Sequence, residues 1–310
     1  LKSRLNDDLT LEGSPEQIQK ALVTMYKTEY VREWQKFMQG ITVQEFGSFD
    51  QAVVRMNRLG DPAASPIGRL MQTLYDETSW DNPSLLNERL ERTQRGFVAW
   101  FKQTILRQAP PRVQFDVNVN AGQAEVPVGP IGKEFAGLTR LMMARDNTPT
   151  LMRNYLEALA KVRSRFNQMK NQGDTGPASR QLMHQTLEGG SSELAEALRL
   201  VDEQMLNGMS DTAKATLRPL LVRPLMQAYA VVVPPAEGEL NRVWHAQVYE
   251  PYQRTLAGKY PFSRDAKTEA TPSDIAKIFG PEGAIAKFSE QTLGPLVTRR
   301  GDTLTARTWA

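Results

Sequence analysis

The sequence contains no cysteine and only two histidines among its 310 residues. Without cysteine the chain can form neither disulfides nor thiolate metal sites, and it has no cysteine nucleophile. That absence leaves the periplasm open, since a chain with an adequate apolar core needs no disulfides. His184 and His245 lie far apart, with no ligand-spaced acids beside either. Both are therefore predicted to be solvent-facing or hydrogen-bonded structural residues, rather than parts of a metal site or a catalytic triad.

Long hydrophobic runs and a strong charge of one sign are also missing. The most conspicuous apolar run, Ala228 to Ala236, contains two prolines and is much shorter than the ~20 residues of a membrane-spanning helix. Residues 1–4 lead into polar sequence rather than into the apolar region of a signal peptide. The net charge of +3 is too small to indicate a nucleic-acid partner. We therefore expect neither a membrane span nor nucleic-acid binding in this chain.

Signatures of nucleotide binding and catalysis are absent as well. The glycines at 129–132 and 280–283 form neither a P-loop nor a dinucleotide fingerprint, so no cofactor is expected. The nearest candidates for a glycosidase-type carboxylate pair are Asp202-Glu203 and Asp76-Glu77. Spacing alone cannot reveal such pairs because they converge in space. Both candidates lie on helical patterns and are predicted to be surface charge.

What the sequence does contain is a succession of helical patterns with start and stop signals. Residues 14–17 combine a serine N-cap, a first-turn proline and a glutamine at the third helical position, and they predict a helix to Gly40. Ser48 and Ser65 predict the starts of two further helices. A longer helical pattern follows residues 82–83 and ends at two prolines.

Aromatic and methionine residues at helical spacing are interpreted as core. Tyr30, Trp34 and Phe37 form one such stripe on the first predicted helix. Most of the 12 methionines occupy stripe positions, so we interpret them as core filling rather than as an adaptable binding face.

The apolar period changes at residues 113–119, where valine and phenylalanine alternate with polar residues as in a strand. No partner strand is evident, so we expect an extended crossing segment or an edge strand. The glycine- and proline-rich residues 122–132 are the best candidate for a joint between subdomains.

Helical patterns then resume, and prolines are expected to divide them. Residues 171–177 are predicted to be a flexible polar loop. Pro219 and Pro224 predict a kink or two successive helices, since proline lacks the backbone donor. Pro234 and Pro235 are expected to separate this region from the helix that carries Trp244.

Together these patterns predict a mainly all-α fold: an elongated multi-helix body with one short extended segment near 113–119. The expected organisation is a helical subdomain at 1–120, a second helical subdomain at 133–296, and an extended tail at 297–310 leading to a missing domain. No repeat with matching signature residues is evident.

The most informative stretch runs from Tyr260 to Pro295, just after Gly258. Gly258 is expected to close a helix with a positive φ, and Pro261 fixes a stiff turn between Tyr260 and Phe262. Rings of this size are usually buried as anchors. Residues 271–274 then predict an N-capped short helix. Gly280 should end it, and Pro281 should begin another short helix that carries Phe288.

This series resembles the C-terminal periplasmic region of the IcmF/TssM family of type VI secretion systems. The residues that carry the resemblance are Trp244, Tyr260, Pro261, Phe262, Phe279, Gly280, Pro281, Gly283 and Phe288. Ile278 stands where the family often has phenylalanine. We interpret these residues as a structural corner, with direct partner contact as the alternative for the Tyr-Pro-Phe element.

The resemblance implies a non-enzymatic scaffold that spans the periplasm in the secretion membrane core complex. Its implied partners are other copies of itself, the outer-membrane lipoprotein TssJ and the inner-membrane protein TssL. In the family a C-terminal β-rich region makes much of the TssJ contact and the nucleotide-binding region lies upstream. We therefore expect this chain to bind TssJ weakly or not at all and to bind no nucleotide.

Two other functions remain open from the sequence. One is a periplasmic hydrolase acting on peptidoglycan, which would require convergent acids in a cleft. The other is a cytoplasmic helical adaptor.

Overall fold

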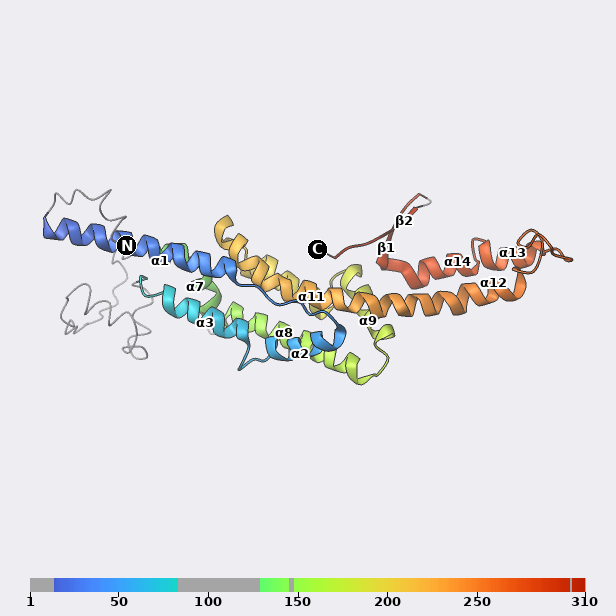
Figure 1. Ribbon diagram of the computed structural model, residues 1–310, viewed down its shortest axis with the longest axis horizontal. Coiled ribbons are helices and arrows are strands. Elements are labelled where there is room, and N and C mark those ends of the chain that lie inside the picture. The colour runs from blue at the N-terminus through green and yellow to red at the C-terminus, as the bar shows by residue number, and fades with distance from the viewer. Residues whose placement is uncertain (1–13, 83–128, 145–147, 302, 310) are drawn as a thin grey trace. The chain divides into compact units, whose positions relative to one another are not determined.

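The computed structural model describes residues 14–82, 129–144, 148–301 and 303–309. These residues are mainly helical and carry a small antiparallel sheet, which confirms the predicted all-α class. The first helices are α1 (Pro15–Gly40), α2 (Phe49–Leu59), α3 (Pro66–Thr78), α6 (Pro130–Glu134) and α7 (Ala136–Met142). The next are α8 (Leu151–Asn171), α9 (Thr175–Glu188), α10 (Glu193–Arg199), the π-helix η1 (Leu200–Met205) and α11 (Asp211–Trp244). The last elements are the π-helix η2 (His245–Tyr249), α12 (Glu250–Thr255), α13 (Pro272–Phe279), α14 (Ala284–Lys287), the π-helix η3 (Phe288–Leu293), the 3-10 helix η4 (Gly294–Leu296), β1 (Val297–Arg300) and β2 (Thr303–Ala306) (Figure 1).

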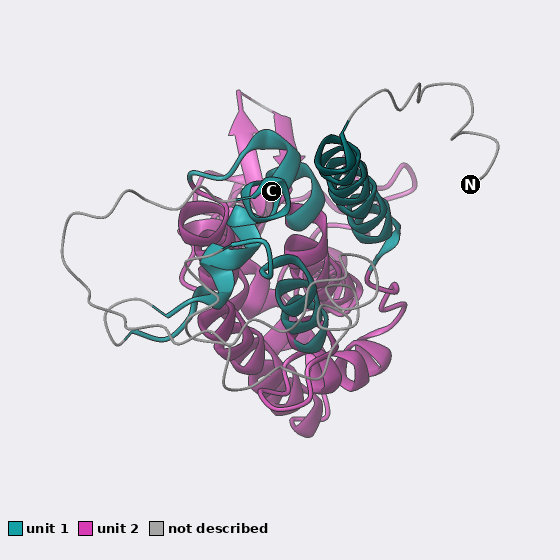
Figure 2. Cartoon of the chain, turned by 90° about the vertical axis from the view of Figure 1, so that its left-hand side faces the viewer, with its two compact units in different colours: residues 1–42, 69–151, 208–217 teal, residues 43–68, 152–207, 218–310 magenta. Residues whose placement is uncertain are grey.

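The chain forms two compact units whose segments alternate along the sequence (Figure 2). Unit 1 comprises residues 1–42, 69–151 and 208–217, and unit 2 comprises residues 43–68, 152–207 and 218–310. The extended segment predicted at 113–119, the helix predicted after residues 82–83 and most of the predicted joint at 122–132 lie outside the described residues. The predicted domain boundaries therefore stay predictions.

The predicted helix start signals form the expected caps. The Ser14 hydroxyl accepts the Gln17 backbone N–H, and the Gln17 side chain accepts the Ser14 N–H, which closes a capping box on α1. Ser48 and Ser65 each accept a backbone N–H in the first turn of α2 and α3. Caps of this kind stabilise a helix by about 1 kcal/mol each.

The prolines do not divide α11 into separate helices, so the expected division there is wrong, while the kink given as the alternative at Pro219 and Pro224 stays a prediction. The helix runs unbroken through Pro219, Pro224, Pro234 and Pro235. Each interior proline costs a helix about 3 kcal/mol, and tertiary packing offsets that cost. The buried stripe of α11 continues across all four prolines through Leu217, Leu221, Leu225, Ala228, Val232 and Ala236.

Two local predictions around turns are also wrong. The polar loop expected at 171–177 is shorter, because Asp174 caps α9 and the helix begins at Thr175 with Pro177 inside its first turn. The helix before the Tyr-Pro-Phe element ends at Thr255, and Gly258 lacks the positive φ that was expected of it. In both places the chain closes its turn with backbone hydrogen bonds that composition does not reveal.

The core of unit 2 is organised around α8. The buried stripe of this helix comprises Met152, Tyr155, Leu159, Val162, Phe166 and Met169. The Phe166 ring stacks on Phe49 of α2, with centroids 5.3 Å apart and planes at 15°. A Cβ at Gly60 would lie 2.7 Å from the Leu159 carbonyl oxygen, so this close approach to α8 requires glycine.

Unit 1 has its core on helices other than α1. Its buried side chains include Met71, Leu74, Ile131, Phe135, Leu138 and Leu141. Met38 is the buried residue of α1. Tyr30 and Trp34 are half-buried and Phe37 is 50% exposed, so the predicted core stripe on α1 is wrong for Phe37. The interpretation of methionines as core filling is confirmed for Met38, Met56, Met71, Met152, Met169, Met205 and Met209.

Candidate functional site

The residues of the predicted motif lie together in a helical hairpin of unit 2, which we call the arm (residues 244–296). The end of α11, η2 and α12 form one limb, and α13, α14 and η3 return beside it (Figure 1). Trp244 meets Phe288 edge to face, with ring centroids 5.0 Å apart and planes at 77°. Val248 and Leu256 are buried in this hairpin.

The Tyr-Pro-Phe element forms a backbone-bonded turn at the end of the arm. The Tyr260 N–H donates to the Thr268 carbonyl and the Tyr260 carbonyl accepts from the Ala270 N–H, both at 2.9 Å. The Tyr260–Pro261 peptide bond is cis. These bonds fix Tyr260 in an extended conformation, as the following proline predicts.

Three rings from the two limbs form an aromatic cluster at this turn. Tyr252 of α12 meets Phe262 edge to face at 5.8 Å, and Phe262 stacks on Phe279 of α13 at 5.7 Å with planes at 6°. Tyr252 also meets Phe279 edge to face at 6.3 Å. Aromatic pairs of this geometry contribute about 0.5–1.5 kcal/mol each beyond the area they bury. The cluster therefore joins α12 to α13.

An acidic residue adds a second link between the turn and α13. Each Asp274 carboxylate oxygen lies 3.2 Å from a lysine Nζ, one from Lys259 and the other from Lys277. The Asp274 backbone N–H donates to the Thr271 hydroxyl at 3.1 Å, which is the predicted N-cap. Lys277, then Lys259 and Thr271, lower the pKa of Asp274 below its usual value. The Asp274 carboxylate therefore links the turn to α13.

Exposure divides the motif residues into two groups. Phe288 is 6% exposed and serves as a core residue of the arm. Tyr260 is 59% exposed and Phe279 is 51% exposed. The expectation that the rings of Tyr260 and Phe262 are buried anchors is therefore wrong for Tyr260, because the turn leaves one side of the cluster open, whereas Phe262 is half-buried.

The corner between α13 and α14 depends on two glycines. A Cβ at Gly280 would lie 2.5 Å from the Ala276 carbonyl oxygen, and one at Gly283 would lie 2.7 Å from the Ile278 carbonyl oxygen. The second short helix begins at Ala284, with Gly283 as its N-cap, rather than at Pro281 as predicted. Residues 281–283 form a turn instead, in which the Gly283 N–H donates to the Gly280 carbonyl at 2.9 Å.

Both histidines have polar partners. His184 Nε2 lies 3.1 Å from the Thr292 carbonyl oxygen of η3, and burial lowers the pKa of its ring. His245 Nδ1 lies 3.5 Å from the Glu250 carboxylate. In the described ranges no group of three or more His, Asp or Glu side chains could hold a metal ion.

The two predicted acid pairs take part in surface contacts. Arg218 donates to Asp202 at 3.0 Å, and Gln72 donates to Asp76 at 2.9 Å. Both contacts are exposed. Among the described residues, neither pair belongs to a group of three or more acids or histidines that could hold a metal ion.

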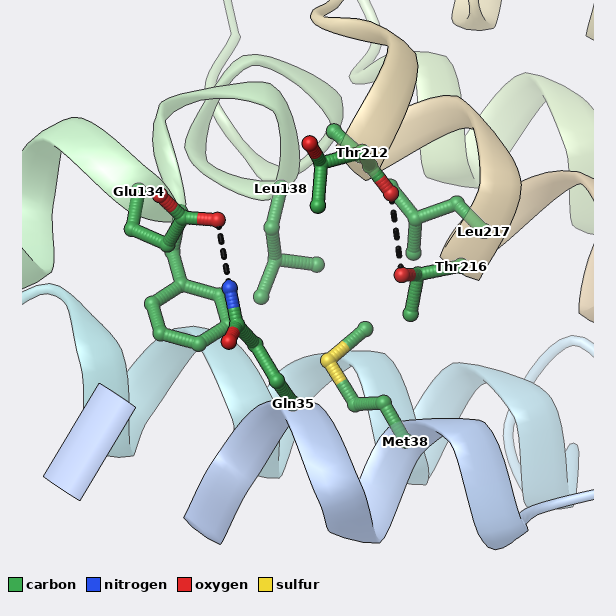
Figure 3. A pocket seen from close by; sticks show the side chains of 9 residues that line it. Gln35, Met38, Glu134, Leu138, Thr212, Thr216 and Leu217 are labelled. Atoms are coloured by element: carbon green, nitrogen blue, oxygen red, sulfur yellow. Dashed lines mark hydrogen bonds between the residues drawn. The ribbon is translucent and has the colours of Figure 1, made fainter. Parts of the chain in front are cut away.

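A small pocket lies within unit 1 (Figure 3). Gln35 and Met38 of α1 face Glu134, Leu138 and Thr212 across it. Its cavity volume of about 30 Å³ suits a water-sized occupant. The Gln35 amide donates to the Glu134 carboxylate at 2.6 Å. Among the described residues that line the pocket, Glu134 is the one carboxylate, whereas glycosidase chemistry uses a pair.

The hairpin of β1 and β2 was not predicted from the sequence. Its strands pair antiparallel, with Arg300 opposite Thr303 and Val297 opposite Ala306. A two-residue connection containing Gly301 joins them. A glycine-containing pair between two runs rich in β-branched residues is a hairpin signal, and it could have found this element.

No helix in the described part of the chain combines the length and hydropathy that a membrane crossing requires.

Comparisons with known proteins converge on one family. A family model described as "IcmF-related: Intracellular multiplication and human macrophage-killing" matches residues 2–79, and one described as "Type VI secretion protein IcmF helical domain" matches residues 235–310. The type VI secretion system component TssM1 of Pseudomonas aeruginosa is 23% identical over 308 residues, which cover 96% of this chain.

Two solved structures share the fold. One, titled "Type VI secretion system membrane core complex", has a TM-score of 0.70 at 21% identity over 95% of this chain and 52% of its own. Another, titled "Type VI membrane complex", has a TM-score of 0.65 at 20% identity over 95% of this chain and 49% of its own.

The fold and the two matching models define the class, a helical protein of the IcmF type. The chain belongs to the IcmF/TssM family, as the motif in the arm indicated. It spans about a quarter (26%) of the length of the curated relative that it matches.

Proposed function

We propose that this chain is a non-enzymatic scaffold segment of a TssM-like protein in a type VI secretion membrane core complex. In this proposal it lies in the periplasm and links the inner and outer membranes through protein–protein contacts. The observation that carries the proposal is similarity across nearly the whole chain, since 96% of it aligns with TssM1 and 95% superposes on a chain of a membrane core complex.

The state of the more buried carboxylates supports a structural role. Asp81 is paired with Lys27, Glu239 with Arg242 and Asp274 with Lys259. A general acid or base needs a carboxylate that is free to exchange a proton with a substrate. Carboxylates held by lysine or arginine instead stabilise packing, as a scaffold requires.

The open side of the aromatic cluster supports a contact role for the arm. Tyr260 and Phe279 present half-exposed rings on a backbone that hydrogen bonds hold in place. Preordered aromatic residues contribute strongly to protein interfaces because they bury a large area with little loss of conformational freedom. We assign these two rings to contact with another subunit. Other copies of this protein, TssL and TssJ are the proposed partners, with TssJ held mainly by segments other than these 310 residues.

Cysteine labelling tests the proposed location. The 310 residues contain no cysteine, so Gln253→Cys on the exposed face of α12 introduces one reactive thiol into this region. In cells with a permeabilised outer membrane, a membrane-impermeant maleimide should label it, beyond the background of the unsubstituted protein. Labelling only after lysis of the inner membrane would support the cytoplasmic adaptor instead.

Co-purification tests the proposed contact. Tyr260→Ser with Phe279→Ser should reduce recovery of the assembled complex while the helical circular dichroism of the purified chain stays unchanged. Gln253→Ser, an exposed change on the same arm, is the matched control. Full assembly with both aromatic residues replaced would contradict the contact role.

Calorimetry tests whether TssJ binds mainly to segments other than these 310 residues. The isolated chain should bind TssJ weakly or not at all. Nanomolar binding would show that these residues themselves form the main TssJ site.

A further inference from the structure

The hairpin of β1 and β2 has an unused strand edge. The Arg307 N–H donates to the Leu296 carbonyl at 2.9 Å, which extends the ladder one pair beyond Val297 and Ala306. Hydrogen-bonded and non-hydrogen-bonded pairs alternate in an antiparallel ladder. The N–H and C=O groups of Leu304 and Ala306 therefore point away from β1, to the free side of β2.

This edge is accessible and has no backbone partner in the described part of the chain. All four residues of β2 are exposed, and Leu304 is 44% exposed. Among the residues that the structure describes, no other segment donates to or accepts from the outward groups of Leu304 and Ala306. An isolated two-stranded hairpin is marginally stable in water, so a third strand would stabilise this one.

The charge of the hairpin indicates what kind of segment would bind at this edge. Arg299 and Arg300 are successive residues of β1, so one side chain stands on each face of the sheet. Arg307 follows at the end of β2, and Asp302 is the single acid within residues 297–307. None of the three arginines has an ion pair with a carboxylate of the described residues. The hairpin is therefore basic on both faces: Arg307 directly follows the strand with the free edge, and Arg299 and Arg300 lie one strand further in, on β1.

We propose that β2 accepts a third β-strand from an acidic, extended segment of another protein. Backbone hydrogen bonds to Leu304 and Ala306 supply the affinity, and the arginines on both faces of the hairpin attract glutamate or aspartate side chains of the added strand, with Arg299 and Arg300 acting across the intervening β2. A second copy of this hairpin is a poor occupant because edge pairing would bring like charges together. The proposal depends on the hairpin alone and not on the secretion role.

Synthetic peptides provide the test. The probe is a capped seven-residue peptide that alternates glutamate with valine and threonine, and the matched control has lysine in place of glutamate. The expected result is saturable binding of the acidic peptide to the 310-residue chain. Amide hydrogen exchange should then slow at Leu304 and Ala306 in nuclear magnetic resonance spectra.

Two pairs of variants test separately what the backbone edge and the arginine charges contribute to binding. Ala306→Pro removes an outward N–H and should abolish binding, whereas Ala306→Ser keeps that N–H and should bind normally. Nuclear Overhauser contacts between Thr298 and Thr305 show whether each variant keeps the hairpin. Arg299→Gln with Arg300→Gln should weaken binding roughly three- to tenfold, as expected for two exposed charge pairs. Arg264→Gln, another exposed arginine, should have no effect.

Each contrary result overturns a defined part of the proposal. Equal binding of the lysine peptide would refute the acidic occupant. Unchanged exchange at Leu304 and Ala306 would refute the edge. A dimer that protects these amides without peptide would show that a second copy is the occupant.

Discussion

The packing of α8 against α11 and the turn of the arm use the same residue types in opposite ways. Tyr155 is fully buried, and its hydroxyl donates to the Leu221 carbonyl at 2.7 Å. Tyr260 has fixed backbone bonds but a ring that is 59% exposed. A tyrosine can thus be a core residue or an ordered surface residue. The contacts of its neighbours decide which.

Two glycines show the same contrast between the packing around α8 and the arm. A Cβ at Gly60, beside α8, and one at Gly283, in the arm, would each lie 2.7 Å from a carbonyl oxygen. The first contact joins elements distant in sequence, whereas the second lies between two short neighbouring helices with one side open. We therefore expect an added Cβ to destabilise the chain more at Gly60 than at Gly283, although the two contact distances are equal.

The largest expected effect is at Tyr155. Tyr155→Ala should lower the free energy of unfolding by about 3–5 kcal/mol because it leaves a cavity between α8 and α11. Tyr155→Phe should cost about 1–2 kcal/mol, since only the hydrogen bond is lost. Urea denaturation at constant m-value measures both. A loss below about 1 kcal/mol for Tyr155→Ala would contradict the contrast drawn here between the buried Tyr155 and the exposed Tyr260 of the arm.

Alanine at the two glycines sharpens the comparison. Gly60→Ala should destabilise the chain by about 1–3 kcal/mol because α8 cannot retreat from the added methyl group. Gly283→Ala should cost less, since the four-residue α14 can shift. The two denaturation midpoints give the difference. A larger loss at Gly283 would mean that the corner of the arm is the more rigid of the two.

Two substitutions near the turn should separate stability from assembly. Thr271→Ala removes the N-cap of α13 and should cost about 1 kcal/mol. Tyr260→Ser changes an exposed ring and should stay within about 0.5 kcal/mol, although it should impair complex recovery. Thermal denaturation of both variants, with wild type as the reference, measures this. A large loss of stability for Tyr260→Ser would instead show that the Tyr260 ring stabilises the fold.

The smallest expected effect concerns pH. Burial lowers the pKa of His184, so the folded chain binds its proton less readily than the unfolded chain does. Stability from this residue is therefore complete above the unfolded pKa of about 6.5 and declines as the pH falls through that value. Unfolding midpoints at pH 7.5 and pH 5.5 should differ less in His184→Gln than in wild type. Equal pH responses would exclude His184 as the cause.

Local signals predicted much of this molecule. The caps at Ser14, Ser48 and Thr271 rest on side chains within three residues of their targets, so sequence suffices to locate them. The resemblance in the arm also identified the family. Exposure of Tyr260 could not be predicted, since it depends on the bonds to Thr268 and Ala270.

Distant contacts explain the remaining differences. Continuity of α11 depends on a buried stripe that meets Tyr155, and neither periodicity nor propensity contains that partner. The hairpin was missed for another reason: its signal was present at Gly301 but lay in a segment interpreted as a loose tail.

The four prolines of α11 have a consequence for the order of folding. A peptide of residues 211–244 alone should be largely unfolded in water, because the interior prolines cost about 3 kcal/mol each and no partner offsets them. α11 can then become helical only when α8 is present to receive its apolar face. The helix that looks most continuous in the native chain is thus expected to form late, after the shorter helices that it joins.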